Sequence, residues 1–149
     1  MATLKGAPDA HAAIVAAARS FLGVKFKHRG RDPRTGLDCA GLVVCSFRKA
    51  GMDPFDKLVY GREPFKDGLV QVVESNLGKP LPPNTPMQPG DVCVFRFSKE
   101  PHHLGILGDY IHGGLSVIHA YGGVEKVVEH RLDDVWSARI CSVYRLQVD

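Results

Sequence analysis

A proline-rich segment divides this 149-residue chain into two parts with different patterns. Residues 79–90 contain five prolines. Because proline has a fixed φ and no backbone N–H, this segment can form neither a helix nor a central strand. Apolar residues recur at helical spacing before it, whereas short β-rich runs follow it. Helices segregated along the chain from antiparallel strands predict an α+β fold, in one domain that spans residues 1–149.

The first part of the chain has the pattern of three helices. Apolar side chains recur every three or four positions and a glycine closes each run. The predicted helices cover residues 9–22, 39–50 and 65–77. The basic segment 25–36 contains glycines and a proline, which predicts a loop.

The second part has the pattern of five strands separated by Gly-rich or charged turns. The predicted strands cover residues 91–97, 103–107, 115–119, 124–130 and 138–147. Short runs at this spacing are typical of an antiparallel meander, in which each strand pairs with the next.

Composition excludes several classes of partner. The chain is 44% hydrophobic and 23% charged, as in ordinary soluble domains, and its net charge of +3 is too small to indicate nucleic-acid binding. No run approaches the roughly 20 apolar residues of a membrane span, and the N-terminus lacks the apolar core of a secretory signal. We expect cytoplasmic synthesis without a signal peptide, and no membrane or nucleic-acid partner.

The chain has four cysteines with long, irregular spacings, namely Cys39, Cys45, Cys93 and Cys141. Without a Cys-x-x-Cys pair or a signal, neither a disulfide framework nor a structural zinc site is expected. We predict no cofactor and no metal. Any reactive cysteine must therefore be recognised by its surroundings.

Cys39 lies in the first turn of the second predicted helix. The free N–H groups of a helix N-terminus favour the thiolate, which is the nucleophilic form, so we expect the pKa of Cys39 to be lowered. Asp38 is the predicted N-cap, although its charge opposes the thiolate unless an imidazolium offsets it. The backbone N–H of Cys39 is placed to donate into an oxyanion hole. The small residues Ala40 and Gly41 would leave room for a substrate; alternatively, Cys39 is simply a packed core residue.

Two histidines have the spacing of a general base and its orienting partner. Residues two apart share a face of a strand, so His103 should face away from the core side of Leu104 and Ile106, while His102 has the opposite parity. Antiparallel pairing would bring His119 beside His103, where it could fix the ring orientation that a base needs. The alternative is that these histidines, among seven in the chain, are only packed or solvated.

Five segments occur in a particular order: Leu22–Phe26, Gly36–Leu42, Gln88–Val92, His103–Ile106 and Ile118–Ala120. Together they resemble the NlpC family of bacterial and phage cell-wall cysteine peptidases. The resemblance implies a papain-like fold, with N-terminal helices packed on a small antiparallel sheet. It implies Cys39 as nucleophile, His103 as base and His119 as the orienting residue. It also implies peptidoglycan stem peptides as substrates, cleaved at the γ-D-glutamyl-diaminopimelate bond.

The chain departs from the family pattern in two respects. Phe26 stands where members often have tyrosine, so the hydrogen bond of that hydroxyl is lost. We expect no wall-binding module, and the run Ala138–Arg145 is more similar to the phage-tail and prophage branch. That similarity implies phage tail proteins as partners, and a virion tail that delivers the enzyme to the periplasm or cell wall.

Basic residues of the segment before Cys39 are candidates for substrate binding. A stem peptide carries several carboxylates, and arginine is their usual paired partner. We therefore predict that Arg29, Arg31 and Arg34, together with Phe26, contact the substrate. The alternative is a solvated charged loop.

Three other functions stay open at this point. The first is a papain-like amidase or acyltransferase on another substrate, and the second is a catalytically inactive tail-assembly component. The third is a metal-binding or structural module, although no spacing gives a paired-ligand signature. Its ligands would come from His102, His103, His112, His119, His130 and Cys93.

Overall fold

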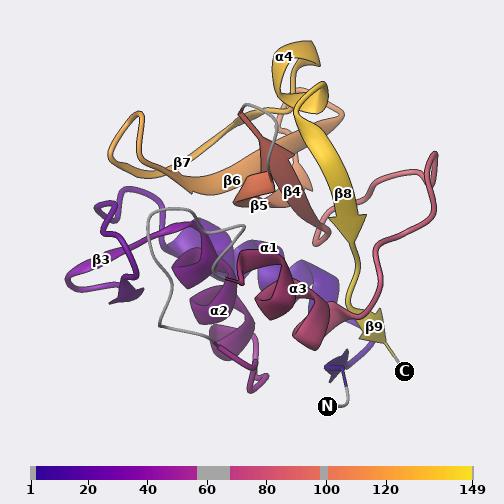
Figure 1. Cartoon of the computed structure of the whole chain (residues 1–149), viewed down its shortest axis with the longest axis horizontal. Helices are drawn as coiled ribbons and strands as arrows, with labels where there is room; N and C mark the ends of the chain where they lie inside the picture. The colour runs from indigo at the N-terminus through magenta and orange to yellow at the C-terminus, as the bar shows by residue number, and fades with distance from the viewer. Residues whose placement is uncertain (1–2, 57–67, 98–100, 149) are drawn as a thin grey trace.

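The computed structural model describes residues 3–56, 68–97 and 101–148, with the side chains of residues 101 and 102 excepted. Three of the four described helices pack on one face of a five-stranded antiparallel sheet, which confirms the predicted α+β fold (Figure 1). The helices are α1 (Ala10–Ser20), α2 (Cys39–Lys49), α3 (Leu69–Leu77) and α4 (Asp134–Ser137). The sheet contains β4 (Val92–Arg96), β5 (Pro101–Asp109), β6 (Leu115–Tyr121), β7 (Lys126–Arg131) and β8 (Ile140–Tyr144).

The strand order of this sheet is β7-β6-β5-β4-β8, so the predicted simple meander is wrong at its last strand. β8 pairs with β4 at the opposite edge, where Tyr144 lies across from Val92. The connection from β7 carries α4 over the end of the sheet before β8 returns (Figure 1). The prediction assumed that each strand pairs with the next one along the chain. The connection that contains α4 instead takes β8 to the other edge of the sheet.

The sheet is apolar on both faces. Alternate residues such as Leu104, Ile106 and Ile118 join the helices in the main core. The intervening positions, including Phe95 and Val117, form a second buried cluster on the other face. Because successive side chains of a strand point to opposite faces, this division follows directly from the strand pattern.

Three short features were not predicted. β1 (Lys5–Gly6) and β9 (Gln147–Val148) form a parallel pair that holds the two ends of the described chain together (Figure 1). β2 (Arg31–Asp32) and β3 (Gly36–Leu37) form a hairpin within the predicted loop, and α4 has only four residues. Elements this short carry too few residues for a periodic pattern to identify them.

The remaining predictions differ from the structure mainly at their ends. The described part of the third predicted helix is α3, whose N-cap is Gly68, while residues 65–67 lie outside the described residues. In the described part of the chain, no helix is long and apolar enough to cross a membrane.

Candidate active site

Cys39 is the first residue of α2 and is 8% exposed. Asp38 is the N-cap, and its Oδ1 atom accepts a hydrogen bond of 2.7 Å from the backbone N–H of Gly41. Its other oxygen accepts from the backbone N–H of Arg29 at 2.9 Å. Asp38 therefore fixes both the start of α2 and the loop that precedes it, so the position of Cys39 is well defined.

The surroundings of Cys39 favour the thiol over the thiolate. Burial, together with the charge of Asp38, raises the pKa of Cys39 to about 12. The backbone N–H groups of Leu104 and Ala40 act in the opposite direction, as does the Arg31 charge, but they do not outweigh burial. The prediction of a lowered Cys39 pKa is therefore wrong for these surroundings. Loss of hydration destabilises the buried thiolate by more than the N–H groups of the helix N-terminus stabilise it. A base must take the thiol proton.

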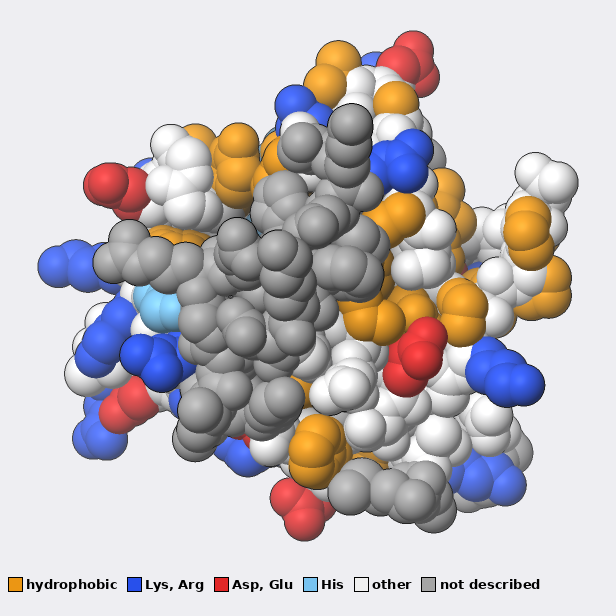
Figure 2. Space-filling view, viewed as in Figure 1, with side chains coloured by type: hydrophobic (Ala, Val, Ile, Leu, Met, Phe, Trp, Pro, Cys, Tyr) orange, Lys and Arg blue, Asp and Glu red, His pale blue; other side chains and the backbone are white. Residues whose placement is uncertain are grey.

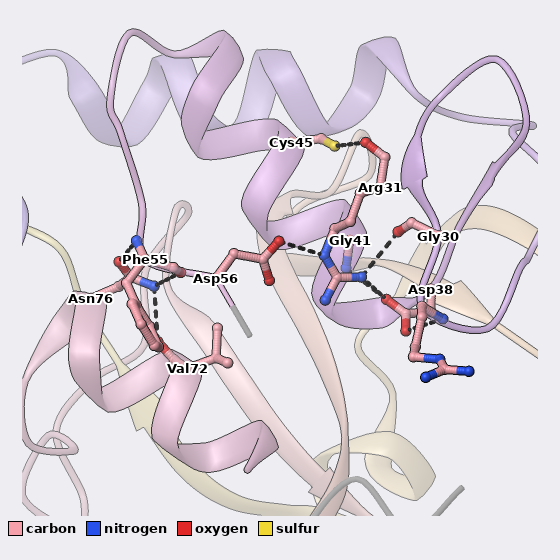
Figure 3. A network of polar contacts seen from close by, with 10 residues as sticks. Gly30, Arg31, Asp38, Gly41, Cys45, Phe55, Asp56, Val72 and Asn76 are labelled. Carbon is pink, nitrogen blue, oxygen red and sulfur yellow. Dashed lines mark hydrogen bonds and ion pairs between the residues drawn. The ribbon is translucent and has the colours of Figure 1, made fainter. Parts of the chain in front are cut away.

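Arg31 lies at the centre of a buried network that includes Asp38, the residue directly before Cys39 (Figure 3). Its Nη1 atom lies 2.9 Å from Oδ1 of Asp38, and its Nε atom lies 2.9 Å from Oδ2 of Asp56. The side chain of Arg31 is only 11% exposed, and the sulfur of Cys45 donates to its carbonyl oxygen. The predicted role of Arg31 in substrate binding does not fit this placement, because both carboxylates already occupy its guanidinium. Arg31 instead ties the loop to the N-terminus of α2.

The small residues after Cys39 serve packing. A Cβ atom on Gly41 would collide with the carbonyl oxygen of Gly30. Ala40 is buried and lines a small interior pocket together with Val43 and Leu104. The expectation that these two residues leave room for a substrate is therefore wrong. Only a residue without a side chain allows the loop to approach α2 this closely.

The two predicted histidines meet on the face of the sheet opposite the main core. The Nε2 atom of His103 lies 2.7 Å from the Nδ1 atom of His119, and the two side chains are buried. The neighbouring residues Leu104 and Ile106 lie in the main core, so the predicted strand parity holds. A Cβ atom on Gly105 would lie 3.0 Å from the ring of Phe95, so glycine is needed beside this pair. The side chain of His102 lies outside the described residues.

His119 is held as a neutral imidazole. Burial, and secondarily the neighbouring His130, lowers the pKa of His119 to about 3. His130 belongs to β7, and its Nε2 atom lies 2.9 Å from Nε2 of His119. No sequence pattern assigned His130 to the active site. It lies opposite Val117 while His119 lies opposite Val128, a diagonal relation that only the strand register reveals.

Aromatic rings cover the imidazoles. The Trp136 ring of α4 lies 4.7 Å from the ring of His119 and 5.4 Å from that of His130, measured between centroids. Tyr121 stacks on His119 with an interplanar angle of 13°. Phe97 contacts the ring of His103 at 5.4 Å. This aromatic cluster was not predicted from the sequence, because α4, which carries Trp136, is too short to have a recognisable periodic pattern.

The other predicted substrate residues lie on the side of the molecule that carries β3. Arg29 is exposed, and Arg34 is exposed and pairs with Asp32 at 3.1 Å. Blue basic side chains gather on this side in Figure 2, and the exposed ones of this segment also include Lys25 and Lys27. Phe26 is half-buried against the main core. Their contact with substrate stays a prediction.

The described residues contain no group of three or more His, Cys, Asp or Glu side chains arranged to hold a metal ion. His119 and His130 do lie together, but they hydrogen-bond to one another. This arrangement matches proton transfer better than metal binding.

A sequence profile of the NlpC/P60 family matches residues 23–145, which is most of the chain. The chain belongs to the NlpC/P60 family. One curated relative, the bifunctional muramidase/DL-endopeptidase CwlT of Bacillus subtilis, is 39% identical over 49 residues. That match covers 33% of this chain and 15% of CwlT. The chain thus corresponds to a small part of that relative.

Solved structures show that this NlpC/P60 chain has the papain-like fold of the family. A lipoprotein-like NLP/P60 protein of Staphylococcus aureus superposes with a TM-score of 0.67 at 18% identity, over 100% of this chain and 45% of that one. The NlpC/P60 domain of the peptidoglycan hydrolase SagA gives 0.59 at 23% identity, over 91% and 98%. The peptidoglycan hydrolase RipB of Mycobacterium tuberculosis gives 0.58 at 20% identity, over 93% and 65%.

Proposed function

We propose that this chain is a cysteine endopeptidase that hydrolyses peptidoglycan stem peptides. The observation that carries the proposal is the 2.7 Å hydrogen bond between His103 and His119, on a strand that also reaches Cys39. The backbone N–H of Leu104, the residue after His103, acts on the Cys39 sulfur. A thiol, an imidazole and a group that orients the imidazole are the components of cysteine-peptidase chemistry.

Cys39 and His103 carry out the proposed reaction. His103 accepts the Cys39 thiol proton as the sulfur attacks the substrate carbonyl carbon, and then donates that proton to the departing amine. The resulting thioester is hydrolysed by a water molecule that His103 deprotonates, which restores the thiol. Because burial raises the pKa of Cys39, proton transfer accompanies the attack rather than preceding it. The backbone N–H of Cys39 would stabilise the oxyanion.

The proposed bond is the γ-D-glutamyl-diaminopimelate link of the stem peptide. The relative CwlT is a DL-endopeptidase by name, and the structural neighbours SagA and RipB are peptidoglycan hydrolases by name. A stem peptide is short, branched and rich in carboxylates, which distinguishes it from an unfolded protein chain.

Exposed cations beside the site support an acidic substrate. Lys25, Lys27, Arg29 and Arg34 are exposed on the segment that leads to Cys39, and Phe26 adds an apolar contact there. If these cations bind substrate carboxylates, increasing ionic strength should raise KM more than it lowers kcat, because salt screens exposed charges. Arg31 is excluded from this set by its burial between two carboxylates.

The proposal extends to where the enzyme acts. We infer delivery to the cell wall by a phage tail, in line with the resemblance of residues 138–145 to that branch of the family. Association with tail proteins in a virion preparation, detected by mass spectrometry, would support this part. Absence of the chain from the virion would contradict delivery by a phage tail and would leave the proposed reaction unaffected.

The deciding experiment compares a purified tetrapeptide stem with denatured casein. Mass spectrometry should detect release of the γ-D-glutamyl product from the stem, and Cys39→Ser should abolish it. Cys141→Ser, which removes an exposed thiol on β8, is the matched control and should retain activity. Efficient cleavage of casein with the stem untouched would remove the wall substrate. Transfer to an added amine in place of hydrolysis would instead identify an acyltransferase.

A further inference from the structure

Three imidazoles form a continuous hydrogen-bonded row across the sheet. His103 of β5 lies 2.7 Å from His119 of β6 through Nε2 and Nδ1. His119 lies 2.9 Å from His130 of β7 through the Nε2 atoms of both rings. The Nδ1 atom of His130 lies 2.9 Å from the carbonyl oxygen of Arg131. The row therefore ends on a backbone group whose hydrogen-bonding character is fixed.

That carbonyl determines where each proton lies. A carbonyl oxygen only accepts, so Nδ1 of His130 must donate, and in the neutral ring Nε2 is left to accept. Nε2 of His119 then donates to it. His119 is neutral because burial lowers its pKa to about 3, so its Nδ1 atom accepts from Nε2 of His103. Nδ1 of His103 is consequently the nitrogen without a proton, and in the proposed reaction it accepts the proton of the Cys39 thiol.

We propose that His130 is a positioning residue that sets which nitrogen of His103 carries the proton, an inference that rests on the proposed role of His103 as base. If His130 offers no acceptor, His119 can reverse its tautomer and donate from Nδ1. His103 then accepts at Nε2 and carries its own proton on Nδ1, where it cannot receive one from the thiol. The third imidazole thereby acts on the reaction without touching substrate.

Solvent is poorly placed to substitute for His130. His119 is fully buried, and the Trp136 ring covers both it and His130. Tyr121 stacks on the same ring of His119. In the unsubstituted protein the His130 ring occupies the approach to Nε2 of His119. The acceptor at that point is therefore supplied by the protein.

The test separates hydrogen-bonding character from size. His130→Gln offers a side-chain carbonyl that can accept, whereas His130→Lys can only donate. His112→Gln, an exposed histidine in the turn between β5 and β6, is the control for loss of an imidazole. Nitrogen-15 NMR of histidine-labelled protein at pH 8 reports the tautomer of His103 without any substrate. Steady-state kinetics on the tetrapeptide stem give kcat and KM separately.

We expect the Nε2–H tautomer of His103 in the unsubstituted protein, in His130→Gln and in His112→Gln. His130→Lys should shift His103 to the Nδ1–H tautomer and lower kcat roughly 10- to 100-fold with KM unchanged, as for other partners that orient a functional imidazole. If His130→Lys does not fold, His130→Leu, which has no acceptor, should give a mixture of tautomers. An Nδ1–H tautomer in the unsubstituted protein, or equal spectra for all His130 variants, would overturn the proposal. If the NMR spectra show the expected tautomers but the unsubstituted protein does not cleave the stem, the proposed substrate is wrong and the role of His130 in setting the tautomer of His103 is still supported.

Discussion

The guanidinium of Arg31 lies 2.9 Å from the carboxylate of Asp38, the residue directly before Cys39. The same carboxylate caps α2 through the backbone N–H of Gly41. One ion pair thus links the loop that leads to the active site with the helix that carries the proposed nucleophile (Figure 3). The arginine also opposes the unfavourable effect of Asp38 on the thiolate.

Replacing Arg31 should be strongly destabilising. Arg31→Met would remove the cation that pairs with the buried carboxylates of Asp38 and Asp56, and removal of one partner from such a group costs about 3–5 kcal/mol. Urea denaturation of the variant measures the loss. Arg34→Met is the matched control, because the pair of Arg34 with Asp32 is exposed and should contribute nothing measurable. Equal stability of the two variants would contradict a structural role for Arg31.

Gly41 should not tolerate a methyl group. Alanine normally stabilises a helix relative to glycine, but here its Cβ would collide with the carbonyl oxygen of Gly30. We expect Gly41→Ala to destabilise by about 1–3 kcal/mol, as other overpacked sites do. Gly122→Ala is the control, because its Cβ would lie 3.8 Å from the Phe26 ring, an ordinary contact. Thermal unfolding of both variants decides whether the loop can move aside.

The reactivity of Cys39 should depend on His103. Burial raises the pKa of Cys39 to about 12, so without a base the sulfur remains protonated at pH 8. In His103→Ala, iodoacetamide should label exposed Cys141 faster than buried Cys39, since only the thiolate reacts and burial disfavours it more at Cys39 than at Cys141. Peptide mapping by mass spectrometry gives both rates. Comparable labelling of the two thiols in this variant would show that Cys39 is activated without the imidazole.

Hydrogen bonding by residue 119 should matter more than its ring. His119→Asn should retain more activity than His119→Ala, because the amide oxygen can still accept the hydrogen bond that Nε2 of His103 donates to residue 119 at 2.7 Å. Turnover of the tetrapeptide stem measures the order of the two variants. His102→Ala should keep most activity and His103→Ala should lose it, since His103 lies against His119 and neighbouring residues of a strand face opposite sides. The reverse ranking of His102 and His103 would sink the assignment of the base.

Acid should weaken the fold through His119. Its pKa is lowered to about 3 from a model-peptide value of 6.5. Between pH 6.5 and pH 3, His119 is therefore mostly protonated in the unfolded chain and mostly neutral in the folded protein. This contribution to stability is present above that pH and is lost as the pH falls toward 3. Denaturation at pH 7 and pH 5 should show a smaller acid loss for His119→Asn than for the unsubstituted protein. Identical losses would mean that His119 is protonated in the folded state.

Local patterns predicted much of the architecture and part of the site. Helical spacing located α2 and therefore Cys39, and strand alternation separated His103 from the core residues Leu104 and Ile106. Both inferences depend only on the period of side chains along one element. The pairing of His103 with His119 was also within reach, because the two strands are consecutive and antiparallel.

The remaining features depend on contacts that no single element encodes. His130 joins the imidazole row only because the β6–β7 register places it diagonally from His119. β8 lies beside β4 because the connection through α4 crosses the end of the sheet.

The sequence by itself determined which segments form the longer helices and the strands of the main sheet, where the thiol stands on its helix, and which face of β5 carries an imidazole, because these properties follow from local periodicity. Only the tertiary structure decided the environment of those groups. It buried Cys39 so that its pKa is raised, and it placed Arg31 between two carboxylates. Burial and ion pairing depend on residues brought together from distant parts of the chain, and the spacing of residues along one segment contains no record of them.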